Sequence, residues 1–232
     1  MFMYLLFSFI FINLIFSCDL IPHLISFNTL KLFYKINKNK NLIYLNDINY
    51  VKKGGNRLLY QHPLDKNKVI KILSNHRKKK CYFIFKYLYI RDENVREYIF
   101  YNKNKNSPFM KYFPKMYGFI NTNKGLGLCY ELILNDDGTI SKNIVEYINI
   151  YGLTEELLSK IKNLISIIKK YNIEHNELNF YNIVVKMNNN KIDNLIIVDG
   201  FGTLNFINKF KIPYSNKIFN LVPDIERDLY KY

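Results

Sequence analysis

The chain has 232 residues, of which 49% are hydrophobic, so it is long and apolar enough to bury the core of one or two domains. Its formal net charge is +15, but only five of its 34 basic residues are arginines. Proteins that bind the phosphates and base edges of nucleic acids depend most on Arg, so we do not expect a nucleic-acid partner. The three cysteines form no Cys-x-x-Cys pair and no zinc-ligand spacing, which argues against a disulfide scaffold and fits a reducing compartment.

Residues 1–30 are predicted to form a hydrophobic helix, because the amino-terminal run MFMYLLFSFIFINLIFS carries no charged side chain. A membrane-spanning helix needs about 20 apolar residues, a length that residues 2–25 reach. Lysines begin at Lys31, so the positive-inside rule would keep the following chain cytoplasmic, tethered to the inner face of the membrane. A membrane anchor and a start-site artefact of an AT-rich gene both stay open. Both are favoured over a signal peptide, which needs a basic n-region, and over a lipoprotein signal ending before Cys18, which Phe16 fits poorly. Residues 31–47 are expected to form a polar linker.

Residues 48–134 are predicted to form a five-stranded antiparallel sheet with one inserted helix. Their β-branched and aromatic residues fall in short runs separated by Gly, Pro, Asn and Asp, which is typical of strands joined by turns. The helix is expected to turn Val95, Tyr98 and Ile99 to one side. The strands are expected within 48–60 on either side of Gly54-Gly55, and at 69–73, 116–122 and 127–134, and the helix at 93–104.

The remaining residues, 135–232, are predicted to hold helices and a small hairpin. Thr154 is suited to cap a helix that runs to about residue 170. A shorter helix is expected at 141–150, and the strand that ends the run EHNELNFYNIVV is expected to pair with 191–198. This order predicts one α+β domain over 48–232, with lobes at about 48–134 and 135–232 and a cleft between them. The apolar residues at helical spacing in the longer helix are Leu157, Ile161, Leu164, Ile165 and Ile168.

Several residues occur in the order that phosphoryl transfer from ATP requires: a Lys for the phosphates, an acid for that Lys, and oxygen ligands for Mg²⁺. Lys71 lies inside an apolar strand, and Glu97, or its rival Glu93, lies on the next helix. Asn182 precedes a strand and Asp199 ends one before Gly-Phe-Gly, so these two are the predicted Mg²⁺ ligands. Each residue also has a simpler interpretation, as a solvent-facing edge Lys, a solvated helix face or a turn residue.

Four further positions are candidates for the same site. Gly54 and Gly55 would let backbone N–H groups approach phosphates. Glu131, in the fifth strand, would lie where the lobes join and where adenine would hydrogen-bond. Glu177, five residues before Asn182, is an acid of the kind that orients an acceptor hydroxyl.

The run EHNELNFYNIV resembles the catalytic loop of protein kinases, VDGFG resembles their Asp-Phe-Gly motif with one residue inserted, and VIKI resembles the strand with the phosphate-binding Lys. A closer similarity is to the YrbL family of PhoP regulatory network proteins, a small kinase-like family. It covers about residues 48–202, through GGNRLLYQHPLDKNKVIKI, REYIFY, PKMYGFINTNKGLGLCYELILNDDGTIS and NIEHNELNFYNIVV. The resemblance implies a bilobal protein-kinase-like fold with a reduced helical C-lobe.

Carried over to this chain, the resemblance implies that Lys71 binds the α- and β-phosphates and pairs with Glu97, while Asn182 and Asp199 bind Mg²⁺. Glu177 stands where the family of protein kinases has a catalytic Asp, and its extra methylene moves the carboxylate by about 1 Å, which can cost on the order of 10²-fold in rate. Only 30 residues follow Gly202, so we expect a small or non-protein acceptor rather than a folded protein substrate.

Three hypotheses about function follow from these residues. The first is an ATP- and Mg²⁺-dependent phosphotransferase that acts on a small hydroxyl-bearing acceptor. The second is a catalytically weak or inactive pseudokinase that regulates a protein partner, which the Glu177 substitution and the reduced Gly loop favour. The third is a membrane-tethered binding protein without a nucleotide site, which predicts no cleft that joins Lys71 to Asp199.

Overall fold

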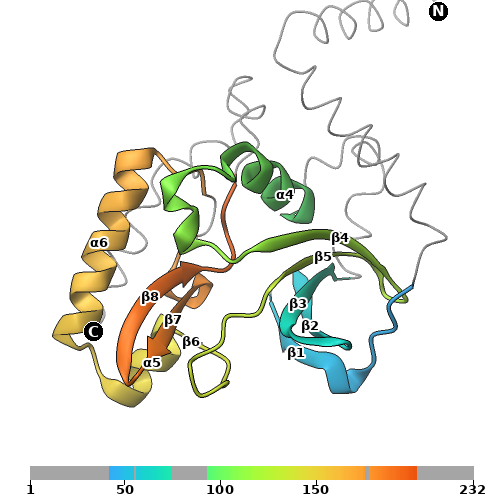
Figure 1. Cartoon of the computed structure of the whole chain (residues 1–232), viewed down its shortest axis with the longest axis horizontal. Helices are drawn as coiled ribbons and strands as arrows, with labels where there is room; N and C mark the ends of the chain where they lie inside the picture. Colours follow the sequence, from blue (N-terminus) through green and yellow to red (C-terminus); the bar gives the residue numbers. More distant parts are fainter. Residues whose placement is uncertain (1–41, 55, 75–92, 176–177, 203–232) are drawn as a thin grey trace, which may run out of the picture.

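The computed structural model describes residues 42–54, 56–74, 93–175 and 178–202 (Figure 1). Within these ranges the chain is α+β, with a five-stranded antiparallel sheet and three α-helices. The predicted hydrophobic segment 1–30 and most of the predicted linker 31–47 lie outside the described residues. In the part of the chain that is described, none of the helices has the length and hydrophobicity of a membrane span.

The five-stranded sheet has the strand order β1-β2-β3-β5-β4, and all its neighbouring strands are antiparallel. The prediction of a five-stranded antiparallel sheet with one inserted helix is therefore confirmed. Helix α4 enters the sequence between β3 and β4 and lies over the sheet (Figure 1). The strands are β1 (Tyr50–Lys53), β2 (Arg57–His62), β3 (Asp65–Leu73), β4 (Met116–Thr122) and β5 (Gly125–Glu131), and the helix is α4 (Glu93–Asn104).

The two faces of β3 bury different kinds of residue because side chains alternate along a strand. Ile70 and Ile72 are buried on one face in a small core that includes Cys129 of β5. Val69 and Lys71 point to the other face, toward α4 and the rest of the chain, and stand opposite Tyr130 and Leu128 of β5. Lys71 is therefore a charged residue on a buried face.

Helix α4 has the predicted bounds, and its buried face is not the side that carries Val95, Tyr98 and Ile99. Its buried residues are Glu93, Asn94, Glu97 and Phe100, and the predicted face of Val95, Tyr98 and Ile99 is only partly buried. The helix turns a mainly polar face inward because cationic side chains on the sheet provide partners for it. A search for apolar periodicity cannot find such a face.

Two strands and one helix have bounds that differ from the predicted ones. Strand β3 begins at Asp65, directly after a tight turn, rather than at residue 69. Strand β5 runs over Gly125–Glu131 rather than 127–134. It ends at Glu131 because the Leu132 N–H leaves the sheet ladder and donates to the carbonyl of Asn67 at 2.8 Å. The helix expected at 141–150 begins at residue 144, because residues 142 and 143 pair with β7 as a short strand and Asn143 then caps the helix.

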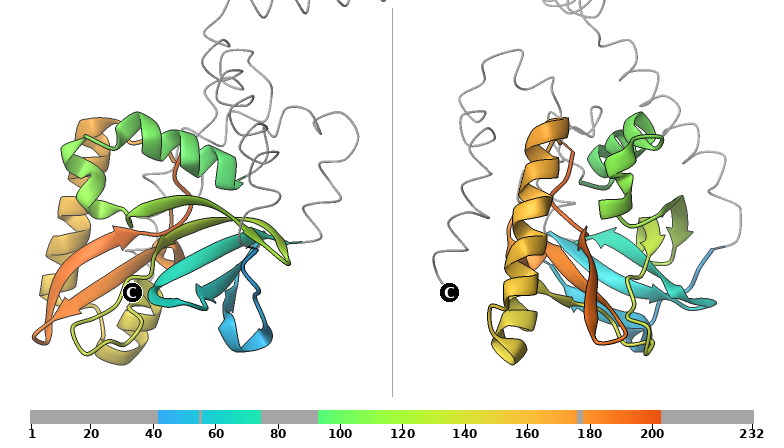
Figure 2. Two further views of the ribbon diagram at one scale, coloured as in Figure 1. Left: turned by 45° about the vertical axis from the view of Figure 1, so that its right-hand side comes forward. Right: turned by 60° about the vertical axis from the view of Figure 1, so that its left-hand side comes forward.

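The second part of the structure is a small sheet covered by a long helix. The sheet has the order β6-β7-β8, and α6 lies against β8 (Figure 2). Thr154 caps α6 as predicted, since its hydroxyl accepts a hydrogen bond from the Leu157 N–H at 3.2 Å, and the five predicted apolar positions are buried. The elements are β6 (Lys142–Asn143), α5 (Ile144–Tyr151), α6 (Glu155–Tyr171), β7 (Ile183–Asn188) and β8 (Lys191–Ile197), with short 3₁₀ turns at Asp47–Asn49, Pro108–Tyr112 and Phe180–Asn182.

One hydrophobic core connects the two parts. It extends from Val69 and Tyr130 of the large sheet through Phe100 of α4 to the buried faces of α6, β7 and β8. Phe201, which is fully buried, packs its ring 5.3 Å from that of Phe100, centroid to centroid. The segment that follows β8 is thus fixed against α4 by packing.

Gly202 brings the segment after β8 directly onto α4. Its φ is +79°, and a Cβ atom there would lie 3.0 Å from both the Arg96 carbonyl oxygen and the Phe100 Cβ. Its N–H donates to the Glu174 carbonyl at 2.8 Å. Gly138 has the same φ of +79° but open space around the position of a Cβ, so it provides a matched control.

We predict that Gly202→Ala destabilises the chain more than Gly138→Ala. Both substitutions put a Cβ on a left-handed residue, at a cost of about 1–2 kcal/mol. Only the substitution at Gly202 would also press the new methyl group against the backbone of α4, which should add about 1–3 kcal/mol. Urea denaturation of both variants measures the difference, and equal losses would show that the contact with α4 is loose.

Candidate functional site

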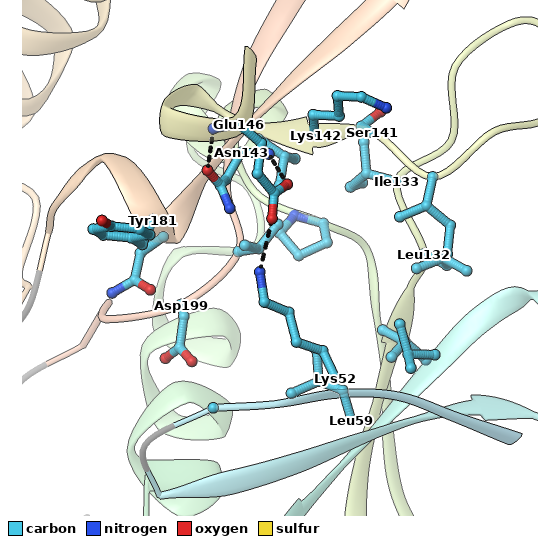
Figure 3. A pocket seen from close by; sticks show the side chains of 18 of the residues that line it. Lys52, Leu59, Leu132, Ile133, Ser141, Lys142, Asn143, Glu146, Tyr181 and Asp199 are labelled. Atoms are coloured by element: carbon cyan, nitrogen blue, oxygen red, sulfur yellow. Dashed lines mark hydrogen bonds and ion pairs between the residues drawn. The ribbon is translucent and has the colours of Figure 1, made fainter. Parts of the chain in front are cut away.

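A pocket of about 800 Å³ lies between the five-stranded sheet and the second part of the structure (Figure 3). Its apolar walls come from both sides, with Leu59 and Val69 on the sheet and Val184 and Val198 opposite. Lys71 and Asp199 also line it. At the pocket rim, Lys52 of β1 donates to the Glu146 carboxylate of α5 at 3.1 Å (Figure 3).

The β7–β8 hairpin brings Asn182 and Asp199 to the same end of the pocket. Ile183, the first residue of β7, pairs with Ile197, the last residue of β8. The Val198 N–H donates to the Asn182 carbonyl at 2.9 Å, so the residue after Val198 emerges beside Asn182. Antiparallel pairing thus explains how two residues 17 apart in the sequence both line one pocket.

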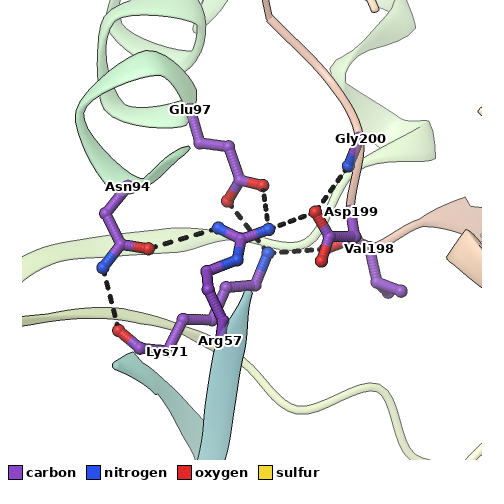
Figure 4. A network of polar contacts seen from close by, with 7 residues as sticks. All are labelled: Arg57, Lys71, Asn94, Glu97, Val198, Asp199 and Gly200. Carbon is purple, nitrogen blue, oxygen red and sulfur yellow. Dashed lines mark hydrogen bonds and ion pairs between the residues drawn. The ribbon is translucent and has the colours of Figure 1, made fainter. Parts of the chain in front are cut away.

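Lys71 and Glu97 form a buried ion pair. The Lys71 ammonium donates to the Glu97 Oε2 at 2.9 Å and to the Val198 carbonyl oxygen at 2.6 Å (Figure 4). Glu97 is fully buried, and the predicted choice of Glu97 over Glu93 as the partner of Lys71 agrees with this geometry. The ammonium therefore connects β3, α4 and the segment that carries Asp199.

A second cation, Arg57 of β2, joins the same cluster, and sequence analysis missed it. Its Nη2 donates to the Glu97 Oε1 at 2.7 Å and also to the Asp199 Oδ1, and its Nη1 donates to the Asn94 Oδ1 at 3.2 Å (Figure 4). Only 3% of Arg57 is exposed. The signal for it was the alternation of β2, which puts Arg57 on the same face as Leu59, a residue of the pocket wall.

Burial and neighbouring charges shift the pKa values of Lys71, Arg57 and Asp199. Burial lowers the pKa of Lys71, and the neighbouring Arg57 lowers it further, against the opposing effect of Glu97. For Arg57, the attraction of Glu97 and Asp199 outweighs the effect of burial and raises the pKa above its ordinary value. Arg57 is therefore the permanent cation of the cluster.

Asp199 is an ionised carboxylate in this cluster. Burial acts to raise its pKa, but Arg57 and Lys71 outweigh that effect, and the pKa falls from the usual 3.8 to about 2. The Gly200 N–H also donates to its Oδ1 at 2.6 Å. About a third of the side chain, 35%, is exposed, so a carboxylate that faces the pocket is open to a ligand.

A described residue of the predicted catalytic loop, His175, pairs with the segment that follows Asp199. His175 and Phe201 form an antiparallel bridge, and Leu178 is buried. Glu177, the predicted acid that orients the acceptor, lies outside the described residues, so its position stays a prediction.

The remaining predicted ligand-binding residues line the pocket only in part. Gly54 lines it, but its N–H donates to the Arg57 carbonyl at 2.8 Å and closes the turn between β1 and β2. Gly55 lies outside the described residues. Glu131 lines the pocket, and its carboxylate accepts a hydrogen bond from the Lys115 N–H at 3.1 Å. Their roles toward a nucleotide stay predictions.

The donor set fits a metal ion that arrives with a phosphate. Within the described ranges, no group of three or more His, Cys, Asp or Glu could hold a metal. Mg²⁺ is commonly held by one or two protein oxygens together with substrate phosphates and water. Asn182 and Asp199 supply amide and carboxylate oxygens of that kind, at the pocket end that also holds Lys71.

We predict that Glu97→Gln lowers the free energy of unfolding by about 3–5 kcal/mol, because it leaves Arg57 and Lys71 buried without their shared anion. Glu155→Gln, on the exposed face of α6, is the matched control and should change stability by less than about 0.5 kcal/mol. Chemical denaturation measures both. A Glu97→Gln loss no larger than that of the control would show that the cluster is not held by Glu97.

We also predict that the stability difference between the wild-type chain and Asp199→Asn depends on pH. The folded pKa of Asp199 is below its unfolded value, so the stabilisation is present above about pH 4 and is lost as the pH falls toward 2. The difference in unfolding free energy, measured in EDTA, should therefore shrink between about pH 4 and pH 2. A constant difference over this range would contradict the charged contact with Arg57.

Comparison with known proteins gives one family. The family model of the PhoP regulatory network protein YrbL matches residues 43–219, which include all the described elements of the pocket. No significant match was found among curated proteins. Because the family model covers most of the chain, the protein belongs to the YrbL family of PhoP regulatory network proteins.

Proposed function

We propose that the chain is a kinase-like phosphotransferase that binds ATP with Mg²⁺ and transfers phosphate to a small or non-protein hydroxyl acceptor. The observation that carries this proposal is the buried Lys71–Glu97 pair, with its ammonium 2.9 Å from the carboxylate, at the end of the pocket where Asp199 is exposed. We further propose that the two parts of the structure correspond to the two lobes of a protein-kinase-like fold, with the joint near residue 134.

The shape and lining of the pocket support a nucleotide as the ligand. Its volume of about 800 Å³ falls in the range of small-molecule sites. Val69 and Val184 offer apolar surface, which suits a flat base, and Lys71 and Asp199 of the charged cluster line the same pocket, which suits phosphates. One ligand with an apolar and an anionic end would satisfy both regions.

Each residue has a role that its chemistry permits. Lys71 would move its ammonium from the Val198 carbonyl to the phosphates and keep Glu97 as its anion. Asn182 and Asp199 would hold Mg²⁺, which supplies charge stabilisation at the phosphates when bound. Glu177 would accept a hydrogen bond from the acceptor hydroxyl and orient it. Glu131 and the Gly54-Gly55 turn would bind the adenine and phosphate regions.

A pseudokinase that regulates a protein partner is the second candidate. The specific observation in its favour is the contact of Arg57 with Asp199, which neutralises the carboxylate without any metal. The replacement of the usual catalytic Asp by Glu177 points the same way. The two candidates differ in one measurable respect, the dependence of ligand binding on Mg²⁺. In either case we propose a cytoplasmic protein, with membrane tethering through residues 1–30 as a separate proposal.

The test is the thermal stability of the full chain with and without ATP, each in Mg²⁺ and in EDTA. A ligand at 100 times its dissociation constant adds about 2.7 kcal/mol to stability, so binding is easily detected. We predict a stabilisation that requires both ATP and Mg²⁺, and its loss in Asp199→Ala. Lys66→Gln, which removes an exposed charge on β3, is the control and should respond as the wild-type chain does.

The outcomes separate the candidates. No stabilisation by ATP in any condition would contradict the phosphotransferase and favour the regulatory protein. Unchanged Mg²⁺-ATP stabilisation in Asp199→Ala would contradict the assignment of Asp199 as a metal ligand.

A further inference from the structure

Arg57 holds the carboxylate that the proposed Mg²⁺ site needs. Its Nη2 donates to the Asp199 Oδ1, and the Gly200 N–H donates to the same oxygen at 2.6 Å. This oxygen therefore already has a cationic and a neutral donor (Figure 4). A divalent ion on Asp199 would lie within a few ångströms of the guanidinium, where repulsion between like charges in a partly desolvated site is strong.

Arg57 can lose its contact with Asp199 and still keep other hydrogen-bond partners. The same Nη2 donates to Glu97 at 2.7 Å and Nη1 donates to Asn94 at 3.2 Å, so Arg57 keeps two buried partners when Asp199 leaves. Arg57 is 3% exposed and Glu97 is fully buried, whereas 35% of the Asp199 side chain is exposed toward the pocket. A metal ion from the pocket thus reaches Asp199 and not Glu97.

We propose that Arg57 is a resident counter-ion of Asp199 that a metal ion must displace, so that Arg57 sets the metal affinity of the site. In the unliganded chain Arg57 joins β2 to the segment after β8 through Asp199. When Mg²⁺ enters, Asp199 exchanges the guanidinium for the metal, and Arg57 stays with Glu97 and Asn94. This inference rests on the proposed function, since it concerns the same carboxylate.

The consequence is that binding of metal alone is weak in the wild-type chain and stronger when Arg57 is removed. The experiment uses Mn²⁺ without nucleotide, because the electron paramagnetic resonance signal of free aqueous Mn²⁺ disappears when the ion binds. Arg57→Gln should bind Mn²⁺ about tenfold more tightly than the wild-type chain or better, since it removes a unit charge in contact with the ligand. Adding Asp199→Asn to Arg57→Gln should abolish the gain.

Lys66→Gln changes the net charge by the same amount but lies near the start of β3, where the strand is exposed. It should leave the Mn²⁺ affinity unchanged. An equal gain in Lys66→Gln and Arg57→Gln would reveal a net-charge effect and overturn the proposal. Unchanged or weaker Mn²⁺ binding in Arg57→Gln would overturn it as well.

A second variant covers the case in which Arg57→Gln does not fold. Arg57→Lys keeps the buried charge opposite Glu97, but an ammonium lacks the planar fork that reaches several acceptors at once. It should therefore release Asp199 and bind Mn²⁺ several-fold more tightly than the wild-type chain, and an unchanged affinity would contradict the proposal.

The Mn²⁺ comparison also separates this inference from the proposed function. A gain in Arg57→Gln together with no ATP binding by the wild-type chain would support the counter-ion and refute the phosphotransferase. Mg²⁺-dependent ATP binding by the wild-type chain without any gain in Arg57→Gln would do the reverse.

Discussion

The buried contact among Arg57, Lys71, Glu97 and Asp199 is the interaction on which the arrangement of the pocket depends. It joins the neighbouring strands β2 and β3 to α4 and to the segment after β8, which follow much later in the sequence. Charged groups that leave water lose hydration, and a buried network of this kind is often no more stable than an apolar core of equal volume. Its charges are balanced because each carboxylate has a cationic partner. We infer that the chain keeps the cluster for binding rather than for stability.

The packing around this cluster explains why its geometry is fixed. Phe201 lies between Phe100 of α4 and Tyr130 of β5, with ring centroids 5.3 Å and 6.4 Å away. Gly202 approaches the backbone of α4 too closely for a side chain. Because the residues on both sides of Asp199 are held, by the β8 ladder on one and by α4 on the other, the carboxylate has little freedom to leave the pocket.

Much of the fold was predictable because its elements obey local patterns. The bounds of α4 and β4, the Thr154 cap and the buried stripe of α6 all follow from spacing and capping. The polar inner face of α4 did not follow, because Glu97 is buried only where cations from distant strands meet it. Arg57 was missed for the same reason: the alternation of β2 places it on the face of Leu59, but its partners Glu97 and Asp199 come from distant parts of the sequence. The position of Glu177 stays a prediction.

The most direct test is a crystal structure of the full chain grown with Mg²⁺ and a non-hydrolysable ATP analogue. We expect phosphates at the Lys71 ammonium, a metal ion on Asp199 and Asn182, and Arg57 bonded to Glu97 but no longer to Asp199. A nucleotide bound elsewhere, or bound in the pocket with the Arg57–Asp199 contact intact, would contradict both the proposed site and the role of Arg57.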